Sequence, residues 1–142
     1  MIIADTNVVS EAMKPFVDMQ VAAWLRKQAI NTIYVTAITK AELFYGLALL
    51  PDGKRKQALA GTMQTFFAER IVTPILGFMD EDALFYGRIS ARRRKAGRPL
   101  KELDGQIAAI AASHGFAVAT RNVADFEHCG IEIFNPWEIA AT

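Results

Sequence analysis

The chain has 142 residues, of which 52% are hydrophobic and 22% charged, and its formal net charge is +1. This length is typical of one folded domain with a substantial core, and the composition excludes a disordered chain. The near-zero charge gives no overall attraction to nucleic acid, although a local basic patch remains compatible with RNA binding. The single cysteine excludes an internal disulfide, and no apolar run reaches the ~18 residues that cross a bilayer, so we expect a cytoplasmic protein with no membrane partner.

Strand and helix patterns alternate in the first half of the chain. The predicted elements are, in order, a buried strand over 2–4, a short helix to about residue 13, a helix capped by Asp18, a strand over 32–35, and helices over 39–50 and 54–69. Asp5 or Thr6 caps the first helix, and Thr39 opens the third. The helix over 39–50 is apolar almost all round, so we expect it to be largely buried.

The second half of the chain continues the alternation. Its predicted elements are a strand over 71–73, helices over 80–95 and 100–113, and strands over 116–119 and 131–133. Asp80 caps the first of these helices, and Gly115 is a natural residue after the end of the second. Strands that alternate with helices favour a parallel sheet covered on both faces. We therefore predict one three-layer α/β/α domain over residues 1–142, with a mostly parallel central sheet.

Asp5 follows the apolar run Ile2–Ala4, at the carboxyl end of the first predicted strand. Ligands of open α/β sheets bind beyond the carboxyl ends of the strands. Asp5 is therefore a candidate site residue as well as a candidate helix cap.

Two further carboxylates, Glu42 and Asp104, occur on apolar faces of predicted helices. An ionised carboxylate without a partner is costly in such surroundings, and proteins retain one where it is paired or binds metal. The alternative is that each acid lies in a first helical turn, near solvent, and interacts with the helix dipole. Gly105, a poor helix former beside Asp104, indicates a close approach to the backbone at this point.

A second polar cluster at the end of a strand is Thr120-Arg-Asn122-Val-Ala-Asp125-Phe126, directly after the strand over 116–119. Asn122 or Asp125 can lie at the mouth of a site that contains Asp5. The alternative is an ordinary polar loop, with Asp125 capping a short helical turn.

Acidic and amide side chains at these positions would form a pocket with oxygen ligands alone. Such a pocket suits Mg²⁺ or Mn²⁺, and a cation of this kind can polarise a phosphoryl oxygen and activate water for in-line attack. Zinc is disfavoured because Cys129 is alone and because His114 and His128 lack ligand spacing.

A basic segment precedes the helix that carries Asp104. Its candidate RNA-binding residues are Arg92, Arg93, Arg94, Lys95 and Arg98, and the run continues to Lys101. A run of charges at a helix C-terminus is commonly a solvated face that interacts with the dipole. The functional alternative is a patch that follows the phosphates of a nucleic acid beside the metal site.

These motifs together resemble those of the PIN-domain ribonucleases, and specifically the VapC/FitB-like toxins of bacterial type II toxin–antitoxin systems. The four matching motifs are Ile3-Ala-Asp5-Thr-Asn7-Val-Val-Ser-Glu11, Thr36-Ala-Ile-Thr-Lys-Ala-Glu42-Leu-Phe-Tyr-Gly46, Leu103-Asp104-Gly-Gln-Ile-Ala-Ala109 and Thr120-Arg-Asn122-Val-Ala-Asp125-Phe126. Each motif is short, but the four occur in the family's order across nearly the whole chain.

The resemblance implies a PIN fold, cleavage of RNA with Mg²⁺ or Mn²⁺, and inhibition by a small cognate antitoxin. It also implies a homodimer that reaches operator DNA only through the antitoxin. By position, the metal-binding catalytic acids are Asp5, Glu42 and Asp104. Many family members have an acid at the position of Asn122, and others use a later one, which in this chain is Asp125; either residue completes the set. The polar residues expected to support the acids are Thr6, Asn7, Thr120 and Asn122.

The leading hypothesis is therefore a toxin endoribonuclease that hydrolyses RNA phosphodiester bonds. The alternative is a catalytically weak PIN-like module that binds RNA or a protein, and the uncharged Asn122 keeps this alternative open.

Overall fold

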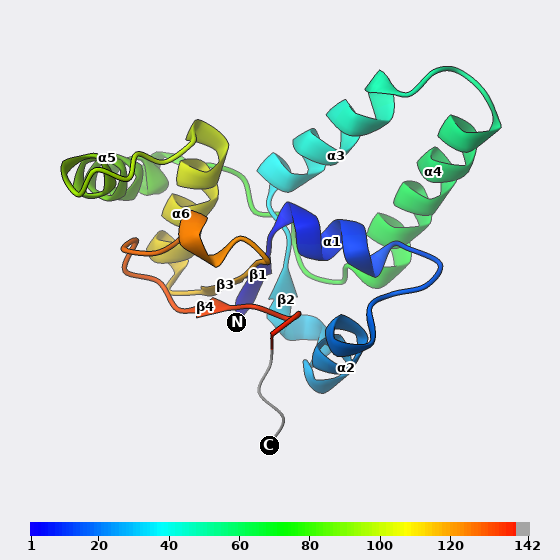
Figure 1. The fold of residues 1–142 in the computed structure, drawn as a ribbon, viewed down its shortest axis with the longest axis horizontal. Helices are drawn as coiled ribbons and strands as arrows, with labels where there is room; N and C mark the ends of the chain where they lie inside the picture. Colours follow the sequence, from blue (N-terminus) through cyan, green and yellow to red (C-terminus); the bar gives the residue numbers. More distant parts are fainter. Residues whose placement is uncertain (139–142) are drawn as a thin grey trace.

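The computed structural model describes residues 1–138, and residues 139–142 lie outside the described part. Four short parallel strands form one sheet in the order β2-β1-β3-β4. The strands are β1 (Ile2–Ala4), β2 (Ile33–Tyr34), β3 (Ala117–Ala119) and β4 (Ile133–Phe134). Since β1 and β3 are the two central strands, their carboxyl ends lie side by side (Figure 1).

Helices flank both faces of the sheet (Figure 1). They are α1 (Thr6–Ala12), α2 (Met19–Lys27), α3 (Ala37–Leu49), α4 (Lys54–Thr65), α5 (Asp80–Lys95) and α6 (Glu102–His114). A π-helical turn, Phe66–Arg70, continues α4, and two 3₁₀ turns cover Ile30–Thr32 and Val123–Asp125. The expected C-terminal residue of α6, Gly115, has a φ of 70°, a left-handed conformation that favours glycine.

The core is divided into two clusters because successive side chains of a strand point to opposite faces. Ile3 and Val118 pack with Ile107 of α6 on one face. Ala4 and Ala119 pack with residues of α1 and α2 on the other face. The predicted three-layer α/β/α arrangement with a parallel sheet is therefore confirmed.

Helices α3 and α4 extend away from the sheet as a pair (Figure 1). The expectation that α3 is largely buried is wrong, because Phe44, Tyr45 and Leu49 are 49%, 67% and 66% exposed. The helix packs on α1, α4 and α6 along part of its surface only. Its apolar outer face is left open to solvent.

Three other local predictions are corrected. Residues 71–73 form no strand: the chain pairs further on, with the residues just beyond β2, where Leu76 N donates to Val35 O at 3.0 Å. Helix α3 is capped by Thr36, whose hydroxyl accepts from Thr39 N at 3.2 Å, rather than by Thr39 itself. Helix α5 begins at Asp80 and has Met79 at its N-cap position. Within the described part of the chain, no helix combines the length and apolarity needed to cross a membrane.

Candidate active site

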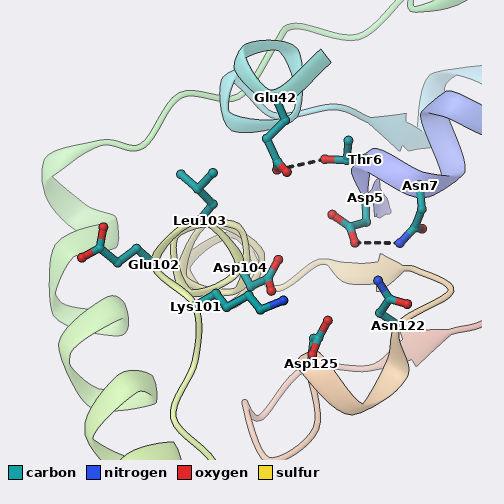
Figure 2. A pocket seen from close by; sticks show the side chains of 10 residues that line it. All are labelled: Asp5, Thr6, Asn7, Glu42, Lys101, Glu102, Leu103, Asp104, Asn122 and Asp125. Carbon is teal, nitrogen blue, oxygen red and sulfur yellow. Dashed lines mark hydrogen bonds between the residues drawn. The ribbon is translucent and has the colours of Figure 1, made fainter. Parts of the chain in front are cut away.

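A pocket of about 500 Å³ opens at the carboxyl ends of β1 and β3. The residues that line it are Asp5, Thr6, Asn7, Glu42, Lys101, Glu102, Leu103, Asp104, Asn122 and Asp125. Figure 2 shows the carboxylates of Asp5, Glu42, Asp104 and Asp125 around one common space. The four acids come from different parts of the chain: the end of β1, α3, α6 and the 3₁₀ turn after β3.

Asp5 lines this pocket and is only 5% exposed. Its backbone N–H donates to Ala119 O at 2.9 Å, which extends the pairing of β1 with β3 by one residue. Asp5 occupies the N-cap position of α1, but its carboxylate makes no capping hydrogen bond. The carboxylate therefore faces the pocket instead of the end of the helix.

Two polar side chains hold the Asp5 carboxylate. The buried Thr120 hydroxyl donates to Asp5 Oδ2 at 2.9 Å, and Asn7 Nδ2 donates to the same oxygen at 3.4 Å. Thr120 Oγ1 also accepts from Asn122 N at 3.1 Å, and Asn7 Oδ1 accepts from Arg121 N at 3.1 Å. This network fixes the loop after β3 against the start of α1.

Burial raises the pKa of Asp5, and the negative charges of Glu42 and Asp125 act in the same direction. The backbone amide of Thr6 and the hydroxyl of Thr120 lower the pKa but do not cancel this effect. A cation in the pocket would relieve the repulsion between these acids.

Glu42 approaches from α3 and is held by Thr6. The Thr6 hydroxyl donates to Glu42 Oε1 at 3.0 Å and lies 3.1 Å from the hydroxyl of Thr39. Glu42 is half-buried in the wall of the pocket. Its carboxylate therefore faces the site in an orientation that α1 sets through Thr6.

Asp104 projects from the first turn of α6. Burial, followed by the charges of Asp5 and Asp125, raises its pKa to about 6. The charges of Lys101 and Arg93 oppose this rise. The backbone of α6 lies close to α5 at this level, because a Cβ atom on Gly105 would lie 2.9 Å from Tyr86 Cε2.

Asn122 and Asp125 both line the pocket. Asn122 precedes the 3₁₀ turn Val123–Asp125, and its carbonyl accepts from Asp125 N at 3.0 Å. Asp125 supplies a negative charge that acts on both Asp5 and Asp104, whereas Asn122 can offer a neutral amide alone.

The donor set of the pocket consists of carboxylate, hydroxyl and amide oxygens with no sulfur or imidazole. In residues 1–138, no three His, Cys, Asp or Glu side chains lie close enough together to hold a metal ion by themselves. Mg²⁺ commonly keeps several waters and binds to one or two carboxylates, so such a cation needs no complete protein cage. The pocket therefore fits a hydrated hard cation.

The basic segment is not one continuous surface. Arg92, Arg94 and Lys95 are exposed, and Arg98 is exposed with its Nη1 3.2 Å from Glu127 Oε2. The expectation that Arg93 contacts RNA is wrong, because its side chain is buried and donates to backbone carbonyls.

Only Lys101 of the basic run lines the pocket (Figure 2). Glu102 and Leu103, which the sequence did not single out, complete the lining at its rim. Their position in the turn that begins α6, beside Asp104, is the signal that could have identified them.

Comparisons with known proteins agree with this geometry. A family model described as PIN domain matches residues 2–130. VapC ribonuclease Y4jK of Sinorhizobium fredii is 41% identical, covering 99% of this chain and all of its own length, and toxin FitB of Neisseria gonorrhoeae is 37% identical, covering 96% and 99%. The crystal structure of FitAcB from Neisseria gonorrhoeae matches with a TM-score of 0.85 at 38% identity, over 98% of this chain and 100% of that one. The chain therefore belongs to the PIN-domain family, in its group of VapC ribonucleases and FitB toxins.

Proposed function

We propose that this ribonuclease toxin hydrolyses RNA phosphodiester bonds with Mg²⁺ or Mn²⁺ held by Asp5 and Asp104, assisted by Glu42 and Asp125. The observation that supports the proposal is the convergence of four acids from separate elements on one pocket (Figure 2). Dependence on a divalent metal is typical of PIN-domain ribonucleases, and the candidate ligands, which are all oxygen atoms, fit it. When bound, the cation supplies Lewis-acid polarisation of a phosphoryl oxygen.

The protein side chains supply orientation and charge. Thr120 and Asn7 hold the Asp5 carboxylate in one orientation, and Asp104 is ionised above its pKa of about 6. Glu42, oriented by Thr6, would accept a proton from the attacking water as the water oxygen bonds to phosphorus. The bond from phosphorus to the leaving oxygen breaks in the same step, and a proton from solvent neutralises that oxygen. Asn122 supports the loop, and Asp125 is the residue that we assign to the fourth acidic position.

The test is cleavage of a labelled single-stranded RNA by the purified protein with Mn²⁺, Mg²⁺ or EDTA. We expect cleavage with either metal, none with EDTA, and a loss of at least about 100-fold in Asp5→Asn, which keeps the shape of the side chain but removes its charge. Glu132→Gln, which removes an exposed charge beside β4, is the control. Cleavage that persists in EDTA and in Asp5→Asn would refute the mechanism.

Matched DNA and phosphomonoester substrates separate the ribonuclease from a DNA nuclease or a phosphatase. Binding of RNA without turnover under any metal would favour the catalytically weak binding module instead.

We further propose that the antitoxin binds the groove between α1, α3 and α4. The groove has a volume of about 770 Å³ and a mainly apolar lining that includes Leu43, Leu47 and Leu59. Thr6 and Glu42 line both this groove and the acidic pocket, so a segment bound in the groove would end at the site. Residues 41–50 line the groove extensively, whereas residues 13–25 contribute only to its edge.

The test of this partner is whether the toxin co-purifies with a small protein, followed by removal of that protein. We expect release of RNase activity on removal, and loss of the complex in Leu47→Arg. Light scattering on the same samples measures whether the toxin is a homodimer, and a mobility shift with operator DNA tests whether DNA binds only when the antitoxin is present. An active, uninhibited complex would contradict the groove assignment.

The exposed residues Arg92, Arg94, Lys95 and Arg98 remain our proposed RNA contacts. They lie on the outside of α5 and in the connection that leads to α6 and Asp104.

A further inference from the structure

Arg93 is the buried cation of the last turn of α5, with an exposed fraction of only 5%. Within residues 1–138, no carboxylate forms an ion pair with it. Its guanidinium instead donates to three backbone carbonyls: Nε to Arg98 O at 2.7 Å, and Nη1 to Ala124 O at 3.1 Å and to Glu127 O at 2.7 Å. A buried charge is costly, so this arrangement persists only because the hydrogen bonds compensate for it.

The three carbonyls belong to two different segments of the chain. Arg98 lies in the turn between α5 and α6, whereas Ala124 and Glu127 flank the part of the chain that carries Asp125. Phe126, between them, is fully buried against the core of α6. The segment from Ala124 to Glu127 is therefore anchored twice: by the packing of Phe126 in the core and by the hydrogen bonds from Arg93.

The other end of the same loop is fixed by Thr120, which accepts from Asn122 N. Between these two anchors, Asp125 has one main-chain hydrogen bond, from its N–H to Asn122 O, and its carboxylate accepts no hydrogen bond among the described residues. Its direction thus depends on the backbone that Arg93 holds.

We propose that Arg93 is a positioning residue that acts through Asp125: its guanidinium fixes the Ala124–Glu127 backbone so that the Asp125 carboxylate faces Asp5 and Asp104. The role rests on the proposed metal-dependent function. A lysine cannot replace it, because one ammonium group lacks the planar fork that reaches three carbonyls at once. Replacing a group that orients a metal ligand commonly weakens metal binding or activity by about 10- to 100-fold.

The test is a double-mutant cycle on Mn²⁺ affinity, measured by calorimetry at one pH without RNA. The proteins are the parent chain, Arg93→Lys, Asp125→Asn and the double variant, with Arg88→Lys as the matched control at an exposed position of the same helix. We expect each single change to weaken Mn²⁺ binding by on the order of tenfold, and the double variant to bind no more weakly than Asp125→Asn alone. Arg88→Lys should bind like the parent.

A merely structural role would give a different result, because the losses of the two single variants would multiply in the double variant. Multiplied losses, or parent-like binding by Arg93→Lys, would overturn the inference. If Arg93→Lys has no cooperative unfolding transition, Arg93→Gln, which keeps one donor nitrogen, takes its place. If neither variant folds, Arg93 belongs to the core, and its role at the site is overturned. Absence of Mn²⁺ binding in the parent would instead refute the proposed function, and the role of Arg93 with it.

Discussion

Replacing Asp104 by Asn should stabilise the metal-free protein while it abolishes cleavage. The pKa of Asp104 is raised from 3.8 to about 6, chiefly by burial and then by the charges of Asp5 and Asp125. Because the pKa in the folded state is the higher one, ionisation of this carboxyl costs stability. The cost is absent below about pH 4, grows between pH 4 and 6, and is complete above pH 6.

The difference between 3.8 and about 6 corresponds to at most about 3 kcal/mol. Asp104 is only partly buried, so solvent screening reduces this to about 1–2 kcal/mol. For a domain of this size, that stabilisation raises the melting temperature by about 3–6 °C. Asn removes the charge, so the gain should appear at pH 7.5 in EDTA and vanish at pH 4.

Thermal unfolding of Asp104→Asn and the parent, in EDTA at both pH values, measures this difference. Glu132→Gln, at an exposed position, controls for the general effect of removing a charge. Saturating Mn²⁺ should stabilise the parent more than the variant, because only the parent keeps the full set of acids. An Asp104→Asn variant that is equally destabilised at pH 4 and pH 7.5 would refute the electrostatic reasoning.

The remaining predictions concern the supports of the site and its substrate. Thr120→Val removes the hydrogen bond to Asp5 Oδ2, so chemical denaturation should show a free energy of unfolding lower by about 1–2 kcal/mol. The acid limb of the pH–rate profile should also move to higher pH, because this hydrogen bond lowers the pKa of Asp5. Gly105→Ala places a Cβ 2.9 Å from Tyr86 Cε2, so the cost of overpacking should exceed the gain in helix propensity by about 1 kcal/mol. The same contact should displace α6, and a reduced kcat would report that displacement. Arg94→Gln should weaken RNA binding and lower the slope of log Kd against log salt by about 0.7 if this residue contacts one phosphate.

Matched substitutions on α4 serve as controls for the first two of these predictions. Gly61→Ala meets no atom within 4 Å and should therefore stabilise the protein. Thr62→Val removes an exposed hydroxyl that donates to Ala58 O, and should leave the pH–rate profile unchanged. A stabilised Gly105→Ala, an unmoved acid limb in Thr120→Val, or an unchanged salt slope in Arg94→Gln would contradict the respective argument.

The candidate acids could be predicted because a carboxylate next to a buried strand or on an apolar helix face conflicts with its local surroundings. Asp5 follows a buried strand, and Asp104 lies on an apolar helix face, so both residues required a reason to be there. The sheet was predictable for a related reason: its central strands are uniformly apolar, as strands covered on both faces require.

The features that could not be predicted from the sequence depend on tertiary contacts. The apolar surface of α3 gives the same pattern whether it packs on the core of its own chain or is left exposed, so its burial was wrongly predicted. Arg93 belongs to a run of basic residues that resembles a solvated face, and its burial depends on carbonyls at Arg98, Ala124 and Glu127. No local pattern identifies those acceptors. The segment 71–73 has strand-like residues, but the chain pairs further on, in a parallel bridge between Leu76 and Thr36 just beyond β2.

Glu42 and Thr6 belong to two surfaces at once, the apolar groove and the acidic pocket. Shared residues make the two binding events interdependent, and thermodynamic linkage makes that dependence reciprocal. A partner in the groove that weakens RNA binding by a given factor is itself weakened by RNA by the same factor. Partner and RNA would therefore compete for the protein. The fraction of protein bound to each would depend on their relative concentrations as well as on their affinities.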